Sequence, residues 1–284
     1  MNNDFMAAVK TANDHAREVG AIKSIATTSM VMEDQGIPFL VRVVENLARK
    51  EKNAASNPAN PFLPYDPDLY VTDISDSHVC LLNKFNVVDH HLLFVTRQYE
   101  SQQSLLTAED FAALWFGLRA MDGLVFYNSC PVAGASQKHK HLQMIPCPLG
   151  ADASQRVPLA ACFTEPKDED VICHSARLPF PHAYAKVTPP RGRSDRESAE
   201  ALRELYMAML QTLRIWKPQS DHGPAPYNLL ATRDWLWLVP RSRAEHRGVA
   251  VNALGFAGTF LLKHASQADI LKAEGPVEIL KAVV

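Results

Sequence analysis

The chain has 284 residues, of which 47% are hydrophobic, so it can form one large domain or two modest ones. Its 29 basic and 31 acidic residues give a net charge of −2, which offers no electrostatic case for binding DNA, RNA or an anionic membrane. Its cysteines are odd in number and form no C-x-x-C pair, which argues against a disulfide framework or a zinc ribbon. Without an apolar signal region or a run of about 18 apolar residues, we expect a cytoplasmic protein with no membrane span.

The first part of the chain is expected to contain a helix, a strand, a loop and a hairpin. Apolar residues at helical spacing predict a helix over residues 4–18, and a largely apolar run predicts a strand over residues 39–47. Residues 50–67 are rich in Asn, Pro and Lys and are expected to form a loop. Two apolar runs at 79–82 and 91–96, separated by polar residues, predict a β-hairpin.

The middle of the chain is expected to contain a second helix and a further strand. Residues 107–121 fit a helix, with Thr107 as a candidate N-cap and Asp110 at the spacing of a capping box. Residues 123–128 are expected to form a short connection. A strand is then expected over residues 139–145.

The last part of the chain is expected to contain a linker, a helix and more strands. Residues 163–197 are weakly patterned and end in a stretch, 188–197, whose Pro, Gly and Arg residues are typical of a linker. Leucines and other apolar residues at three- and four-residue steps predict a helix over residues 198–216. Strands are expected at 227–230 and 235–239, and a strand or a buried segment is expected at 257–263. Separate helices and hairpins favour an α+β fold with a mainly antiparallel sheet.

The segment G-A-S-Q-K-H-K-H-L-Q, residues 134–143, is the most informative part of the sequence. In a strand, His139, His141 and Gln143 would lie on one face, next to a small-residue turn that can present backbone N–H groups to an anion. Histidine can act as a covalent nucleophile while neighbouring donors hold phosphate oxygens. An H-x-H pair alone also fits a metal half-site or a core pair, but the whole segment points to nucleotidyl transfer through a histidine.

In this segment the chain resembles the histidine triad (HIT) superfamily. More narrowly, it resembles the diadenosine tetraphosphate (Ap4A) phosphorylases, or ATP adenylyltransferases, of the galactose-1-phosphate uridylyltransferase branch. Triad hydrolases carry a third histidine where this chain has Gln143, which is typical of the transferases and phosphorylases. Other strings that resemble the family are 82–85, 126–128, 226–230, 239–241 and 255–258. The sequence departs from the family at Cys130-Pro131, where a glycine often stands, and at Thr259, where some relatives have methionine.

The resemblance implies an α+β, HIT-like fold with a mainly antiparallel central sheet flanked by helices. It places the catalytic H-x-H-x-Q motif in a first region, residues 1–187. A linker at 188–197 would lead to a C-terminal region, residues 198–284, that completes the fold and the substrate site.

The resemblance also implies a reaction, in which Ap4A and phosphate give ADP and ATP, reversibly, with ADP/sulfate adenylyltransferase activity as an additional expectation. His141 would attack the α-phosphorus and form an AMP–histidine intermediate, which phosphate then attacks. A backbone carbonyl, for which that of His139 is a candidate, usually fixes the tautomer of such a ring. His139 would donate to phosphate or orient the strand, and Gln143 would hydrogen-bond a non-bridging α-phosphate oxygen.

Further substrate-binding residues are implied by the same resemblance. The family's early lysine is Lys50 or Lys52, Lys84 would offset phosphate charge, and Lys263 would meet the distal phosphates unless it is a solvated surface lysine. Asn128 would reach ribose or phosphate, or else cap a turn. The implied set is Lys50, Asn83, Lys84, Asn128, Gly134, Ala135, Ser136, Gln137, Gln143, Asn252, Ala253, Leu254, Thr259 and Lys263.

We expect Mg²⁺ or another divalent cation, bound chiefly through substrate phosphates, with neither zinc nor a protein metal site. Adjacent His90 and His91 lack the i, i+2 spacing that two ligands on one strand face need. The expected partners are Ap4A, phosphate, ATP and ADP, without nucleic acid or membrane, for a monomer or homodimer. Two alternatives stay open: another nucleotidyltransferase of this branch, acting on a nucleotide sugar or adenylyl sulfate, and a nucleotide-binding sensor without turnover.

Overall fold

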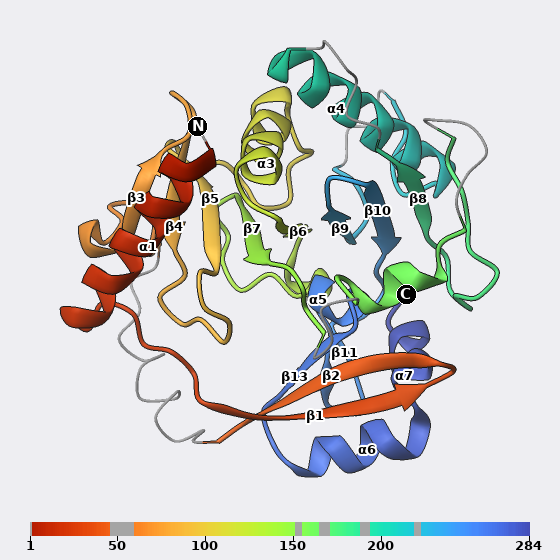
Figure 1. Cartoon of the computed structure of the whole chain (residues 1–284). Coiled ribbons are helices and arrows are strands. Elements are labelled where there is room, and N and C mark those ends of the chain that lie inside the picture. The colour runs from red at the N-terminus through yellow and green to blue at the C-terminus, as the bar shows by residue number, and fades with distance from the viewer. Residues whose placement is uncertain (1, 46–59, 151–154, 165–170, 188–193, 219–222) are drawn as a thin grey trace.

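The central element of the fold is an eight-stranded sheet (Figure 1). In this computed structural model, which describes residues 2–45, 60–150, 155–164, 171–187, 194–218 and 223–284, the strand order is β3-β4-β5-β7-β6-β9-β10-β8. All neighbouring strands in it are antiparallel. The strands are β3 (Tyr70–Asp73), β4 (His78–Leu82), β5 (Leu92–Thr96), β6 (Gly123–Asn128), β7 (His141–Pro146), β8 (Ala183–Lys186), β9 (Tyr227–Ala231) and β10 (Trp235–Pro240).

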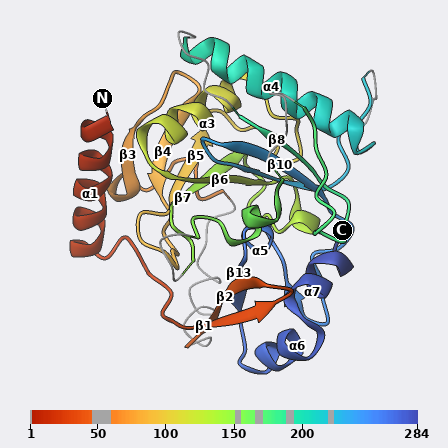
Figure 2. The same cartoon turned by 45° about the vertical axis from the view of Figure 1, so that its right-hand side comes forward.

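Helices cover one face of this sheet, and a smaller sheet lies on its other side (Figures 1 and 2). The covering helices are α3 (Ala108–Ala120) and α4 (Asp195–Thr212), which pack against each other. In the smaller sheet, β1 (Thr27–Asp34) is antiparallel to β2 (Ile37–Val44), and β13 (Thr259–Leu262) is parallel to β2. The remaining elements are α1 (Asn2–Glu18), α5 (Ala253–Phe256), α6 (Ser266–Glu274), α7 (Pro276–Ala282), β11 (Glu245–His246) and β12 (Val249–Ala250).

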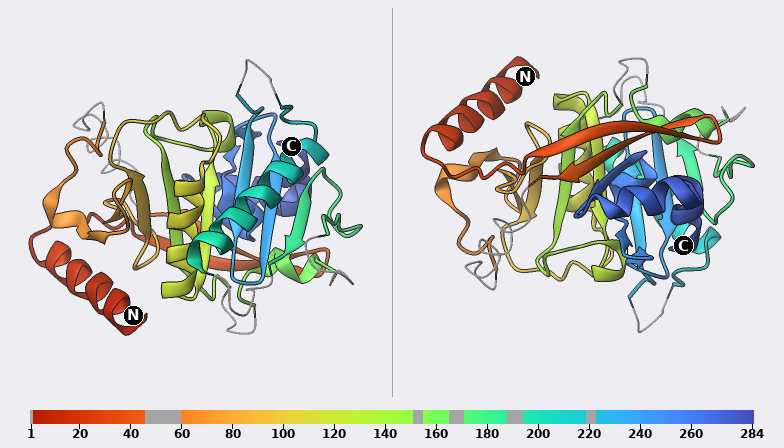
Figure 3. Two further views of the ribbon diagram at one scale, coloured as in Figure 1. Left: turned by 90° about the horizontal axis from the view of Figure 1, so that it is seen from above. Right: turned by 90° about the horizontal axis from the view of Figure 1, so that it is seen from below.

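The smaller sheet separates its side chains into two sets because successive residues of a strand point to opposite faces. Phe39 and Val41 of β2, with Phe260 of β13, pack into a core that also contains buried residues of α6 and α7. Figure 3 shows these two helices beside β1 and β2 in the view from below. The alternate residues, Leu40 and Arg42, line a cavity described in the next subsection.

Several expected elements are confirmed. The helices expected at 4–18 and 107–121 are α1 and α3, and Thr107 and Asp110 form the capping box in both directions. The hairpin expected from 79–82 and 91–96 is the antiparallel pair β4–β5. The strands expected at 227–230 and 235–239 are β9 and β10, and the strand expected at 257–263 contains β13.

The connection expected at residues 123–128 is wrong, because this segment is β6, a strand in the interior of the sheet. Every one of its residues is buried. Val125 and Tyr127 face the core beneath the helices, while Leu124 and Phe126 face the core on the opposite side. A strand packed on both faces lacks the alternation of apolar and polar residues by which a half-buried strand is recognised.

Two boundaries differ from expectation. β7 begins at His141, so His139 lies outside it and forms an isolated bridge with Ser101. α4 begins at Asp195, with Ser194 as its N-cap, so the last residues of the expected linker 188–197 are helical, whereas residues 188–193 lie outside the described part of the chain. β8 precedes this point and β9 follows it in the same sheet, so the expected regions 1–187 and 198–284 share one sheet.

Candidate active site

A cavity of about 880 Å³ is bounded by residues of both sheets, of the β4–β5 hairpin and of the segment around α5. This volume lies in the upper part of the range of small-molecule sites, roughly 300–1,000 Å³. The expected site residues that line it are Asn83, Lys84, Asn128, Gly134, Ser136, Gln137, His141, Gln143, Asn252, Leu254 and Thr259. The fold therefore brings together residues from widely separated parts of the sequence around the H-x-H-x-Q motif.

His141 is the first residue of β7, and its side chain is buried and held in one tautomer. Its Nδ1 lies 2.8 Å from the carbonyl oxygen of His139. Since a carbonyl only accepts, Nδ1 carries the proton and Nε2 holds the lone pair. Burial lowers the pKa of His141 to about 4, so the ring is neutral near pH 7. The carbonyl of His139, which is the candidate from the sequence, therefore fixes the tautomer of the His141 ring.

Gln143 is oriented by a chain of hydrogen bonds that reaches the β4–β5 hairpin. Its Oε1 accepts a hydrogen bond from Nε2 of His91 at 3.0 Å, and Nδ1 of His91 accepts one from Nδ2 of Asn83 at 3.2 Å. Burial lowers the pKa of His91 to about 4, so this ring is also neutral. With its oxygen engaged, Gln143 is left with its NH₂ group as a donor for a ligand in the cavity.

Gln102, which the sequence analysis did not single out, bridges β6 and β7 where their ladder stops. The last paired residues are Phe126 and Gln143, and two residues further along this register Asn128 would lie opposite His141. Instead, Oε1 of Gln102 accepts from the backbone N–H of His141 at 2.9 Å, and its Nε2 donates to the carbonyl of Asn128 at 2.8 Å. A side chain thus satisfies backbone groups that the separated strands leave unpaired.

His139 does not line the cavity, so the expected role as a phosphate donor is not supported. Its Nε2 donates to the carbonyl oxygen of Thr96 at 2.8 Å, and its Nδ1 lies 3.1 Å from Nδ2 of Asn60. Both ring nitrogens are therefore engaged with the protein. His139 fits its alternative role, which is to orient the start of β7 and the carbonyl that holds His141.

The turn before the motif offers fewer backbone donors than expected. The N–H of Gly134 donates to the carbonyl of Pro131 at 3.0 Å, and that of Ala135 donates to the carbonyl of Cys130 at 3.0 Å. Ala135 is also absent from the lining of the cavity. Among the described residues, the N–H groups of Ser136 and Gln137 meet no acceptor, so these two remain available to an anion.

The side-chain oxygen of Asn128 is used within the protein, where it connects β6 to β9 and to the start of α5. Its Oδ1 accepts from the backbone N–H of Ala253 at 2.9 Å and from Nδ2 of Asn228 at 2.8 Å. Ala253 is buried behind this contact and does not line the cavity. Gly134 has φ +96°, and a Cβ there would come within 2.6 Å of the Cβ of Asn252, so this close approach requires glycine.

The three lysines implied by the family are placed differently. Lys84 lines the cavity, with its Nζ 3.4 Å from a carboxylate oxygen of Asp66. Lys263 is exposed and does not line the cavity, which favours the reading of a surface lysine over a contact with distal phosphates. Lys50 and Lys52 lie outside the described residues, as does most of the expected loop.

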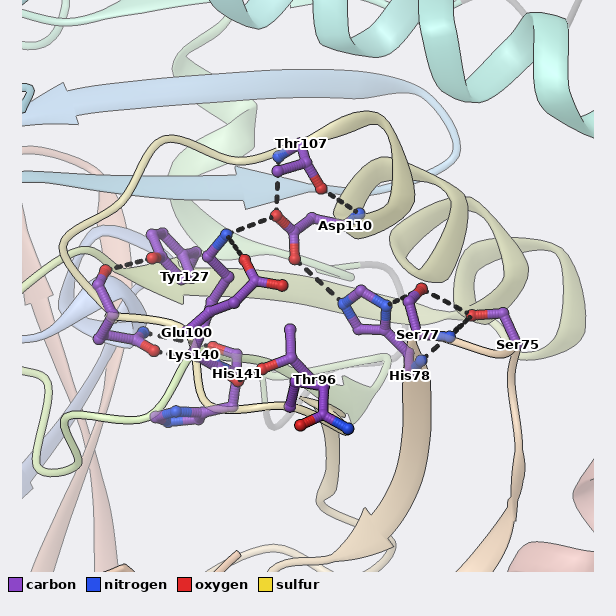
Figure 4. Close-up of polar contacts among 12 residues, drawn as sticks. Ser75, Ser77, His78, Thr96, Glu100, Thr107, Asp110, Tyr127, Lys140 and His141 are labelled. Atoms are coloured by element: carbon purple, nitrogen blue, oxygen red, sulfur yellow. Dashed lines mark hydrogen bonds and ion pairs between the residues drawn. The ribbon is translucent and has the colours of Figure 1, made fainter. Parts of the chain in front are cut away.

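An ionic cluster lies behind the motif, with His78, Asp110 and Lys140 buried and the Glu100 side chain partly exposed at its edge (Figure 4). Lys140, between the two histidines of the motif, has a side chain that is 0% exposed. Its Nζ lies 2.6 Å from a carboxylate oxygen of Glu100 and 3.0 Å from one of Asp110. The other oxygen of Asp110 lies 3.0 Å from Nε2 of His78. Burial would raise the pKa of Asp110, but the His78 hydrogen bond and the charge of Lys140 outweigh it and lower the pKa.

Within the described part of the chain, no three His, Cys, Asp or Glu side chains lie together in a way that could hold a metal ion. Nor is any described helix long and apolar enough to cross a membrane. The described acidic lining of the cavity is Asp66, which already faces Lys84.

The fold and the site are those of a nucleotidyltransferase, with the neutral ring of His141 on the wall of the cavity. A family model described as the Ap4A phosphorylase N-terminal domain matches residues 1–165, and one described as the ATP adenylyltransferase C-terminal domain matches residues 176–284. The chain belongs to the Ap4A phosphorylase family.

Relatives and solved structures agree with this assignment. Diadenosine 5',5'''-P1,P4-tetraphosphate phosphorylase 2 of Saccharomyces cerevisiae is 28% identical over 305 residues, which cover 95% of this chain and 88% of that protein. Protein APA1 of the same yeast is 27% identical over 283 residues, covering 92% and 87%. The crystal structure of yeast Ap4A phosphorylase Apa2 in complex with AMP has a TM-score of 0.77 and 25% identity, covering 98% of this chain and 94% of that one. The expected α+β fold with a mainly antiparallel central sheet is confirmed, and it is shared with yeast Apa2.

Proposed function

We propose that the protein cleaves Ap4A with phosphate to ADP and ATP through an AMP–histidine intermediate on His141. The observation that carries the proposal is the neutral imidazole of His141, whose Nδ1 donates to the carbonyl of His139 and whose Nε2 keeps its lone pair. A relative named as an Ap4A phosphorylase and the solved complexes of yeast Apa2 with Ap4A and with AMP support the choice of substrate.

In the first half-reaction, Nε2 of His141 attacks the α-phosphorus of one adenylyl group. The N–P bond forms as the bond from this phosphorus to the bridging oxygen breaks, and the electron pair leaves with the remaining three phosphates and adenosine as ATP. The Nδ1–H···O=C bond to His139 stabilises the positive charge that the ring acquires.

In the second half-reaction, an oxygen of inorganic phosphate attacks the same phosphorus. The P–O bond forms as the N–P bond breaks, so the product is ADP and the electron pair returns to Nε2 of His141. Sulfate in place of phosphate would give adenylyl sulfate by the same step, which accounts for the ADP/sulfate adenylyltransferase activity that we include in the proposal.

The donors around the cavity hold the transferred phosphoryl group. The NH₂ group of Gln143, oriented through His91, binds a non-bridging oxygen of the α-phosphate. The N–H groups of Ser136 and Gln137 bind the neighbouring phosphate. Ser136 lines the same cavity, so its hydroxyl can donate to that phosphate as well. Because an amide cannot act as a general acid, Gln143 stabilises charge without protonating a leaving group.

A divalent cation, for which Mg²⁺ is the first choice, would neutralise phosphate charge while held by the substrate's own oxygens. Its removal by a chelator is expected to weaken binding of Ap4A without unfolding the protein. Zinc has no part in this proposal. The active unit is a monomer or homodimer.

A product assay tests the proposal. The protein is incubated with Ap4A, with and without phosphate, and the nucleotides are separated. Equal amounts of ADP and ATP that appear only with phosphate support phosphorolysis, and His141→Ala should abolish them. AMP and ATP formed without phosphate would show a hydrolase, and tight binding without products would show a sensor. Turnover of a nucleotide sugar or adenylyl sulfate in preference to Ap4A would show the other transferase of this branch.

A further inference from the structure

Arg42 lies in the wall that the smaller sheet contributes to the cavity, and no step above uses it. It belongs to β2, where its neighbours across the sheet are Ser29 of β1 and Leu261 of β13. Four residues of this wall line the cavity: Leu40, Arg42, Thr259 and Leu261. Leu40 and Leu261 are apolar and Thr259 is uncharged, so Arg42 is the one charged side chain among these four.

Two polar atoms of this wall are buried without a hydrogen-bond partner. They are Nε of Arg42 and Oγ1 of Thr259. Among the described residues, no carboxylate or carbonyl accepts from the Arg42 side chain. A buried donor without an acceptor is destabilising unless a ligand supplies the acceptor. Two such atoms on one cavity wall point to a ligand group that carries oxygen acceptors.

The charges of the cavity favour an anionic group. Its described lysine, arginine and carboxylate lining consists of Arg42, Asp66 and Lys84, and its two histidines are kept neutral by burial. Lys84 faces Asp66 at 3.4 Å, so Arg42 is the described cation of the lining without an opposing carboxylate. The planar fork of arginine, with Nε–H and Nη–H side by side, matches two oxygens of one phosphate.

We propose that Arg42 binds a phosphate group of the leaving polyphosphate, beyond the bond that is cleaved. The inference rests on the proposed function, because it places the substrate's α-phosphate at Gln143 of the large sheet and the following phosphates toward the smaller sheet. Thr259, on the neighbouring strand, supplies a hydroxyl to the same part of the substrate. Arg42 then selects substrates with a long polyphosphate chain over short nucleotides.

Equilibrium binding tests this assignment without turnover. In a His141→Ala background, AMP, ATP and Ap4A are titrated calorimetrically into proteins with Arg42 or with Arg42→Met, an unbranched side chain that fits the apolar wall. Loss of the phosphate contact is expected to raise the Kd of ATP and Ap4A at least tenfold and to change the Kd of AMP less than twofold. Arg42→Lys, which keeps the charge but not the fork, should give an intermediate loss.

The matched control is Arg243→Met, which removes an exposed arginine outside the cavity and should leave all three Kd values unchanged. Unchanged binding of Ap4A by Arg42→Met would overturn the proposal, as would an equal loss for AMP, which would place Arg42 on the base or the α-phosphate. If Arg42→Met does not fold, the same comparison is made with Arg42→Lys. Unchanged binding of Ap4A by that variant, or an equal loss for AMP, would overturn the proposal. Because binding is measured, a wild-type protein that binds Ap4A but fails to phosphorolyse it would refute the proposed function alone.

Discussion

At the scale of single residues, the site works by fixing which atom of each neutral side chain donates and which accepts. The carbonyl of His139 assigns the proton of His141 to Nδ1, and His91 engages the oxygen of Gln143 so that its NH₂ faces the ligand. Neither assignment needs a charged residue in contact with the nucleophile. The chemistry therefore depends on the positions of a few hydrogen bonds, each of which a substitution can remove.

The pH dependence of adenylyl transfer follows from the lowered pKa of His141. An ordinary histidine would lose its lone pair below about pH 6.5, whereas burial lowers this pKa to about 4. The single-turnover rate with Ap4A and no phosphate should therefore stay level through pH 6.5 and fall only near pH 4. A midpoint near 6.5, in protein shown by circular dichroism to be folded, would contradict the assignment.

The same lowered pKa has a consequence for stability. Between about pH 6.5 and pH 4 the unfolded chain binds a proton at this position that the folded protein does not. The contribution of His141 to stability is therefore fully present above pH 6.5, and it is lost as the pH falls through this window.

Gln102 offers a residue-scale test of how β7 is held. Gln102→Leu leaves the N–H of His141 and the carbonyl of Asn128 without their partner, at a cost of about 1–3 kcal/mol for each buried group. We expect a lower midpoint of thermal unfolding and at least a tenfold fall in kcat, because His141 loses its fixed position. Gln103→Leu is the control, since this neighbouring glutamine is exposed. Equal behaviour of the two variants would show that the bridge has no such role.

At the scale of elements, the buried cluster around Lys140 ties three parts of the fold together behind the nucleophile. Asp110 belongs to the capping box of α3, His78 begins β4, and Glu100 follows β5, while Lys140 itself precedes β7. Because successive side chains of an extended segment point in opposite directions, Lys140 anchors the segment from the side opposite His141.

Lys140→Met tests this anchor. Removing one partner of a buried ion pair leaves an uncompensated charge, here the Asp110 carboxylate, and costs about 3–5 kcal/mol. The variant should unfold at a markedly lower denaturant concentration and lose activity at temperatures where wild type is stable. Lys138→Met, two residues earlier and exposed, should change neither property. A Lys140→Met protein as stable as wild type would refute the role of the cluster.

The elements that the sequence predicts well are those with a local signal. The capping box at Thr107 fixes the start of α3, and the polar turn between two apolar runs fixes the β4–β5 hairpin. β6 gives no such signal because its burial on both faces is decided by distant layers. The bridge by Gln102 and the wall position of Arg42 likewise depend on tertiary packing, although a lone arginine in an apolar strand is a signal that could have been noticed.

At the scale of the whole molecule, the site is assembled from both ends of the chain. Arg241, buried after β10, donates to the carbonyls of Ala133, Val251 and Val283 and to Oδ1 of Asn228. It thereby connects the turn before the motif with the C-terminal segment that lines the cavity. The resemblance to the family pointed to the cavity's motif residues and to several of its other polar residues, but only the fold shows that Lys263 lies outside it and that Arg42 lies within it.

The central claim is that His141 carries the adenylyl group during turnover. The most direct measurement is mass spectrometry of the intact protein, mixed at neutral pH with Ap4A and no phosphate. We expect the mass of one added adenylyl group, mapped to His141, absent in His141→Ala and released as ADP when phosphate is added. Full turnover of Ap4A by a protein that never carries this group on His141 would contradict it.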